Sequence, residues 1–161
     1  MPKKIDVAAA RKATGTPYPP PYDEPCRARE RTGLGDAAGL TQFGVNLLRL
    51  PPGAWSSQRH WHSAEDEFVY VLEGEVTLVS EAGEDVLRPG DCAGFKAGEP
   101  DGHCLQNRSG KDAVVLEVGT RSTAGQTVVY PDIDLRILPD TPAGQYVHAD
   151  GTAYPILPRR S

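Results

Sequence analysis

The sequence predicts an all-β fold of short strands, arranged as a sandwich or a barrel. Glycine (17 residues) and proline (15 residues) make up about a fifth of the 161 residues, well above the usual share of roughly 12%, so turns must be frequent. Strand-like apolar runs recur between these turns, and no segment has a convincing helical period. This length suits one domain of about eight to ten strands.

The first 36 residues are predicted to form a proline-rich N-terminal arm, because proline fixes an extended backbone and removes hydrogen-bond donors. The clearest such stretch runs from Tyr18 to Tyr22 and reads YPPPY. A barrel domain is expected over residues 37–130. Residues 131–161 form a C-terminal tail, whose alternating apolar residues at 133–137 can add one strand that packs on the barrel.

Turn signals divide residues 37–130 into successive strands. Gly74 and the turn at 88–91 (RPGD) are examples, since glycine tolerates positive φ and proline presets a tight turn. The expected strands cover residues 43–50, 55–62, 67–72, the neighbours of Val76 and Leu78, the neighbours of Val86, 92–95, 103–108, 113–120 and 126–130.

Charge and composition exclude some partners. A net charge of −5 argues against a nucleic-acid surface, which needs a basic stripe. The longest purely apolar run, Phe68 to Leu72, is far too short to span a membrane. Cys26, Cys92 and Cys104 are widely spaced without a CxxC pair, which favours free thiols and a cytoplasmic location.

Two histidines separated by one residue, His60 and His62, precede a cluster of acids. Side chains alternate between the faces of a strand, so both imidazoles point to one face. Glu67 opens the next expected strand and shares a face with Val69 and Val71. His103 begins a later strand. These three histidines can therefore converge with Glu67 inside a barrel, where such residues are costly to bury unless they are paired or bind a metal.

These residues resemble the two motifs of the cupin superfamily, small jelly-roll barrels with a metal site. The resemblance covers about Leu40 to Arg121. It implies a double-stranded β-helix, the jelly-roll barrel of cupins, with N- and C-terminal arms and one divalent transition metal. The first motif matches Gly53, His60, His62, Glu67 and Gly74, the second matches Gly90, Gly98, His103 and Asn107, and the implied metal ligands are His60, His62, Glu67 and His103.

Two departures from the motifs lie in turns, where insertions cost little. Gly53 stands one residue further from His60 than is usual, and Lys96 replaces a proline ahead of a lengthened loop before His103. Three imidazoles and one carboxylate suit zinc, iron, manganese, nickel or copper, and the sequence does not rank these metals.

Four further residues are candidates for contacting a substrate. Gln58 faces the same way as the HxH pair and Asn107 the same way as His103, so each can orient a substrate or a ligand imidazole, or make an ordinary hydrogen bond of the barrel. No cluster of inward lysine or arginine is evident. Lys96 and Arg108, near strand ends at the barrel mouth, are therefore the best candidates to hold a phosphate.

The resemblance leaves three functions open, each with a small molecule as the partner. Cupins include sugar-phosphate isomerases, in which a metal polarises a carbonyl during proton abstraction, and an isomerase is the leading hypothesis. A dioxygenase that uses the same metal site is the second. A non-catalytic binding barrel is the third, because no inward general base is evident.

An outward row formed by Trp61, Phe68, Tyr70 and Leu72 is too apolar to face water. Either the proline-rich arm or a second subunit must cover it. Small cupins pair as dimers, so the resemblance favours a homodimer.

Overall fold

The computed structural model describes residues 4–121, 125–142 and 144–156, and their regular structure is almost entirely β. Within these residues twelve strands pair in antiparallel sheets. The helical turns are short: η1 (Glu24–Cys26) and α1 (Leu34–Ala37). The prediction of an all-β jelly-roll barrel is confirmed. In the same ranges, no helix has the length and apolarity needed to cross a membrane.

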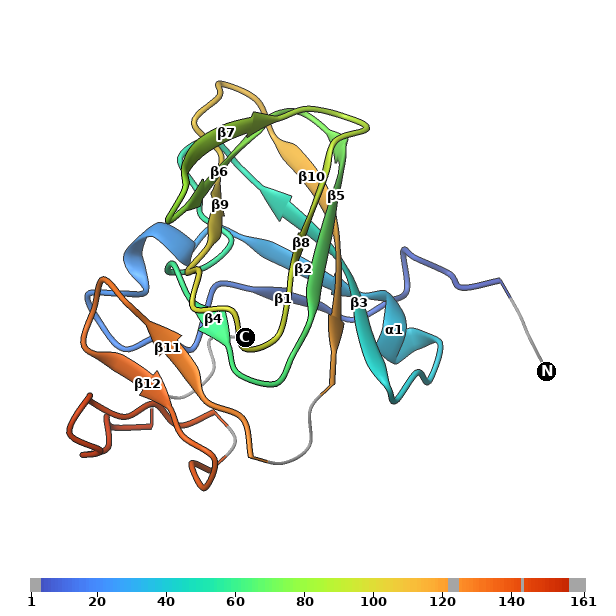
Figure 1. Cartoon of the computed structure of the whole chain (residues 1–161). Helices are drawn as coiled ribbons and strands as arrows, with labels where there is room; N and C mark the ends of the chain where they lie inside the picture. The colour runs from blue at the N-terminus through green and yellow to red at the C-terminus, as the bar shows by residue number, and fades with distance from the viewer. Residues whose placement is uncertain (1–3, 122–124, 143, 157–161) are drawn as a thin grey trace.

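Three sheets build the barrel (Figure 1). The largest has six strands in the order β1-β2-β3-β10-β5-β8, and two three-stranded sheets have the orders β7-β6-β9 and β12-β11-β4. The strands are β1 (Lys12–Thr14), β2 (Glu30–Gly33), β3 (Phe43–Leu50), β4 (Trp61–His62), β5 (Glu67–Glu73), β6 (Val76–Ser80), β7 (Gly83–Leu87), β8 (Cys92–Phe95), β9 (Cys104–Gln106), β10 (Ala113–Thr120), β11 (Val128–Tyr130) and β12 (Leu135–Ile137).

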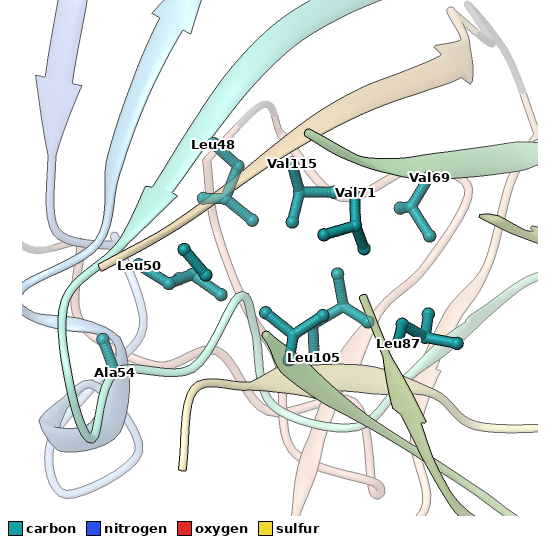
Figure 2. Packing of buried hydrophobic residues seen from close by; sticks show 10 residues of the cluster. Leu48, Leu50, Ala54, Val69, Val71, Leu87, Leu105 and Val115 are labelled. Carbon is teal, nitrogen blue, oxygen red and sulfur yellow. The ribbon is translucent and has the colours of Figure 1, made fainter. Parts of the chain in front are cut away.

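The main hydrophobic core lies between the six-stranded sheet and the β7-β6-β9 sheet. Figure 2 shows Leu48, Val71 and Val115 of the large sheet directed toward Leu87 and Leu105 of the other. Leu48 and Val71 are Cα partners of Val115 from either side, so the inward faces of β3, β10 and β5 are in register. Burial of these aliphatic side chains is the main force that holds the two sheets together.

Strand β5 shows the predicted alternation of faces. Val71 is fully buried, whereas Phe68, Tyr70 and Leu72 are 40%, 38% and 42% exposed. Because neighbouring side chains on a strand point to opposite faces, Glu67 lies on the inward face with the buried valine. The outward apolar row of the sequence analysis is therefore present on this strand.

Residues 55–62 differ from the prediction, because they form only the two-residue strand β4 and not one continuous strand. Trp55 and His60 still make isolated bridges, to Gln106 and His103. Between these bridges the hydroxyl of Ser56 accepts the backbone N–H of Leu105 at 2.9 Å. The Ser56 side chain thus accepts a backbone N–H that would donate to a backbone carbonyl in a regular β-ladder, and this interrupts the strand.

The N-terminal segment contains two strands that the sequence analysis did not predict. β1 pairs with β2, and β2 pairs with β3, so this segment extends the large sheet. Its prolines at 17–25 lie between the two strands and leave both ladders intact. Tyr18 and Cys26 from the same segment pack with Val128 and Leu135 in a second buried cluster, which joins the N-terminal segment to strands β11 and β12.

Candidate metal centre

Strand pairing brings the predicted metal ligands to one end of the barrel interior. His60 and His103 exchange backbone hydrogen bonds of 3.1 and 2.9 Å, which fixes the two side chains as neighbours. His62 lies in β4 and Glu67 opens β5 on the inward face. His103, which lies 36 residues after Glu67 in the sequence, therefore meets the three candidate ligands of positions 60–67.

The distances within this cluster fit a shared ion. Glu67 Oε2 lies 3.7 Å from His60 Nε2, 3.5 Å from His62 Nε2 and 3.0 Å from His103 Nε2. Atoms that each lie about 2.1 Å from one ion are roughly 3–3.5 Å apart. The ligand atoms of His60, His62 and Glu67 all lie within 4.8 Å of one another, and we call these three residues the candidate metal group. His103 contacts this group through Glu67.

Hydrogen bonds at Nδ1 orient two imidazoles of the group. His60 Nδ1 lies 3.0 Å from the carbonyl oxygen of Gln58, and His62 Nδ1 lies 3.2 Å from Oε1 of Gln126. Both oxygens only accept, so each Nδ1 carries the proton and each Nε2 presents a lone pair toward Glu67. This is the tautomer that binds a metal through Nε2.

The protonation states also suit a metal. Burial lowers the pKa of His60 to about 3, so its imidazole is neutral at pH 7. Burial alone would raise the pKa of Glu67, but the hydrogen bond with His103 and the nearby imidazoles outweigh it and lower the pKa to about 2. Neutral imidazole and ionised carboxylate are the forms that coordinate metals. The donor set therefore fits a divalent transition metal.

A cavity of about 420 Å³ is lined by the candidate metal group and by three arginines, Arg29, Arg31 and Arg121. The expectation that no cluster of arginines faces inward is therefore wrong. Residues 27–31 read RARER, and this alternation is typical of a strand with one basic face. It was missed because the N-terminal segment was interpreted as an arm.

Glu117 is a second acidic residue of the cavity that the sequence analysis missed. Its two carboxylate oxygens accept hydrogen bonds from Nε and Nη2 of Arg31 at 2.7 and 2.9 Å. Strand parity could have located it, since it shares a face of β10 with the buried Ala113 and Val115.

Gln58 and Asn107, two of the candidates for substrate binding, make hydrogen bonds within the barrel. Gln58 Nε2 donates to the carbonyl oxygen of Tyr22 at 2.7 Å. The amide of the buried Asn107 donates to the carbonyl oxygens of Leu50 and Lys111, both at 2.7 Å. Neither residue belongs to the described residues that line the cavity.

The two basic candidates at the barrel mouth lie apart from the large cavity. Lys96 is exposed and lines a smaller pocket, which it shares with His62, Glu67 and His103. Arg108 is paired on the surface with Glu84 through bonds of 2.7 and 2.8 Å. The arginines of the large cavity are thus better placed than Arg108 to meet a ligand beside the candidate metal group.

The fold and the site together define a class of protein, a jelly-roll barrel in which two histidines and a glutamate converge as a candidate metal site. Comparisons with known proteins identify the family. The model of the cupin domain matches residues 46–119. The chain is 42% identical to a sugar phosphate isomerase of the cupin superfamily from Silicibacter pomeroyi, with a TM-score of 0.86 over 95% of this chain and 97% of that one. The chain belongs to the cupin superfamily.

Two further structures extend the comparison. A protein from Acidithiobacillus ferrooxidans, proposed to be a sugar phosphate isomerase, is 32% identical with a TM-score of 0.65 over 79% of this chain and 74% of that one. The polyketide cyclase RemF from Streptomyces resistomycificus is 20% identical with a TM-score of 0.58 over 74% and 80% of the two chains, and shares the fold alone. No protein of curated function matches the chain.

Proposed function

We propose that this chain is a metal-dependent isomerase of a small sugar phosphate. The observation that carries the proposal is that the candidate metal group and the guanidinium groups of Arg29 and Arg31 line one cavity. A sugar phosphate offers a carbonyl oxygen to a metal in the candidate metal group and a phosphate to the two guanidinium groups. The names of the Silicibacter and Acidithiobacillus relatives, at 42% and 32% identity, support the same activity.

The proposed metal ligands are His60, His62, Glu67 and His103, with zinc, iron, manganese or nickel as the ion. Inclusion of His103 is supported by its Nε2, which lies 3.0 Å from Glu67 Oε2. A divalent metal bound there would act as a Lewis acid that polarises the substrate carbonyl.

Isomerisation also requires a base, and Glu117 is the proposed one. It lines the cavity, and its two bonds to Arg31 hold it in a fixed orientation. A carboxylate placed in this way can take a proton from the hydroxyl-bearing carbon beside a carbonyl and return it to the carbonyl carbon, while the hydroxyl proton passes to the former carbonyl oxygen. Lys96 and Gln58, expected to contact a substrate, have no role in this proposal, and Asn107 supports the barrel.

Solvent deuterium exchange tests the proposal. Metal-loaded protein is incubated with a panel of aldose and ketose phosphates in D₂O and followed by proton NMR. We expect exchange at the carbon beside the carbonyl together with aldose–ketose interconversion, and we expect Glu117→Gln to slow both by roughly 100-fold or more. The matched control is Glu84→Gln, which removes a surface glutamate. Absence of exchange with every sugar phosphate, or oxygen consumption with an iron-loaded sample, would favour a binder or a dioxygenase instead.

We also propose that the protein is a cytoplasmic homodimer. Three exposed apolar side chains of β5, Phe68, Tyr70 and Leu72, support an interface on the outer face of the large sheet, because such a row is unfavourable in water. The cysteines Cys26, Cys92 and Cys104 are free thiols, which suits a reducing compartment.

A further inference from the structure

We propose that Arg29 and Arg31 form an anion subsite that takes the phosphate group of a dianionic substrate inside the barrel. The inference rests on the proposed function and deepens it, because it names the charge of the ligand and the side chains that bind it. We call these two arginines the arginine pair.

Sheet register places Arg31 on the inward face beside the cavity. Arg31 of β2 is the Cα partner of Leu48 in β3, and Leu48 is the partner of Val115 in β10. Leu48 and Val115 are both fully buried in the core, and directly paired residues share a face. Arg31 therefore points into the barrel, where Glu117 lies two residues beyond Val115.

The charge of Arg31 is matched within the protein. Its two bonds to Glu117 form a bidentate ion pair, which is the strong arrangement for guanidinium and carboxylate. Nη2 of Arg31 also approaches the carbonyl oxygen of Ser56 at 3.4 Å. The guanidinium of the half-buried Arg31 is thus held in place, and Glu117 fixes the orientation of its plane.

The charge of Arg29 is not matched in this way. Arg29 is only 6% exposed, and its hydrogen bonds go to the carbonyl oxygens of Gly15, at 3.0 Å, and of Ser56. A carbonyl carries no net charge, so these bonds orient the guanidinium without neutralising it. Its Cζ also lies 5.8 Å from the centre of the Tyr18 ring.

A buried cation in this position favours an anionic ligand. Burial, followed by the like charge of Arg31, lowers the pKa of Arg29, and the negative charge of an anion beside the guanidinium would offset both effects. The cost of a buried charge is offset only when an opposite charge and hydrogen bonds accompany it. The planar fork of a guanidinium matches phosphate oxygens in two-point contacts.

The charges that line the cavity also match the charge of a phosphate monoester. Arg29 and Arg31 balance Glu67 and Glu117, and the remaining charged residue of the described lining, Arg121, is paired with Asp36. A divalent metal in the candidate metal group would therefore leave a net charge of about +2, and a phosphate monoester carries about −1.5 to −2 at pH 7.

The test is binding of inorganic phosphate to the metal-loaded protein, measured by isothermal titration calorimetry. We expect Arg29→Gln to raise the phosphate Kd by roughly tenfold or more. The matched control, Arg108→Gln, removes an arginine that is paired with a glutamate on the surface, and should leave the Kd unchanged. Equal phosphate binding by wild type and Arg29→Gln overturns the subsite.

Because Arg29 is buried, its replacement can impair folding, which circular dichroism would reveal. In that case Arg31→Lys keeps the positive charge beside Glu117 but removes the planar fork that contacts two phosphate oxygens, and weaker phosphate binding is again expected. An unchanged Kd in this variant also overturns the subsite.

Two outcomes separate this inference from the proposed function. Phosphate binding that depends on the arginine pair, without deuterium exchange into any sugar phosphate, removes the isomerase and leaves the subsite standing. Phosphate binding that is lost in His60→Ala but intact in Arg29→Gln shows that the metal alone holds the anion. That result overturns the subsite whether or not the protein is an isomerase.

Discussion

Arg31 and Glu117 are 86 residues apart in the sequence and are joined by two hydrogen bonds of 2.7 and 2.9 Å. The pair connects β2 to β10 across the intervening strand β3. The side chains are 33% and 17% exposed, so water screens them only in part. The N-terminal segment is therefore tied to the barrel by an ion pair on the cavity side as well as by the ladder of β2 and β3.

Breaking this pair should destabilise the fold, because the remaining charge is left without its partner. We expect Arg31→Met to lower the free energy of unfolding by about 1–3 kcal/mol, measured by urea denaturation. Adding Glu117→Gln to the same chain should recover part of the loss, since it removes the stranded carboxylate. Strictly additive losses from the two substitutions would mean that the residues do not interact in solution.

The candidate metal group predicts that one histidine controls metal content. His60→Ala removes one of three converging ligand atoms, so metal affinity should fall by at least about tenfold, measured by elemental analysis of the purified protein. The control is His148→Ala, because His148 contacts Asp134 at 2.7 Å near the surface of the C-terminal tail. Undiminished metal in His60→Ala would place the ion elsewhere.

Local patterns predicted a sandwich or a barrel in which the candidate metal group can converge, and the cupin resemblance then selected the jelly-roll barrel and the metal ligands. In β5 the period of two placed Glu67 on the same face as Val71, and the structure has that arrangement. The HxH spacing likewise placed His60 and His62 together, because both signals involve residues only a few positions apart. Periodicity of this kind depends on the strand itself and not on its neighbours.

The cavity wall could not be predicted in the same way, because it depends on pairing between distant segments. Arg31 reaches the interior only because β2 pairs with β3, and no local pattern specifies that register. The alternation of side chains between two faces also stops predicting their direction where a strand is short. β9 ends at Gln106, so the alternation that begins near His103 does not extend to Asn107, which instead bonds to backbone carbonyls.

The outer face of β5 predicts a dimer that one charge can disrupt. Tyr70 is the middle residue of the exposed row and is 38% exposed, so Tyr70→Asp would bury a carboxylate in an apolar interface. We expect the wild type to elute as a dimer and Tyr70→Asp as a monomer in size-exclusion chromatography with light scattering. A control change, Val7→Asp, lies at another exposed apolar residue and should leave the dimer intact. A monomeric wild type would rule out the interface.

Gly74, in the turn between β5 and β6, should tolerate no side chain. Its φ is +72°, a conformation that L-residues with a Cβ rarely adopt. A Cβ there would lie 2.4 Å from the carbonyl oxygen of Asp112 and 2.8 Å from Cα of Ala113. Both are backbone atoms at the start of β10, so relief of the clash would require the strand itself to shift.

Gly74→Ala should therefore lower the free energy of unfolding by about 2–4 kcal/mol, the sum of the backbone strain and the steric overlap. The matched control is Gly110→Ala, because a Cβ at Gly110 meets no atom within 4 Å and should change stability by less than about 0.5 kcal/mol. Urea denaturation of the two variants beside the wild type measures the difference. Equal stabilities would mean that the turn is free to rearrange, and that its glycine does not fix how β5 leads into β6.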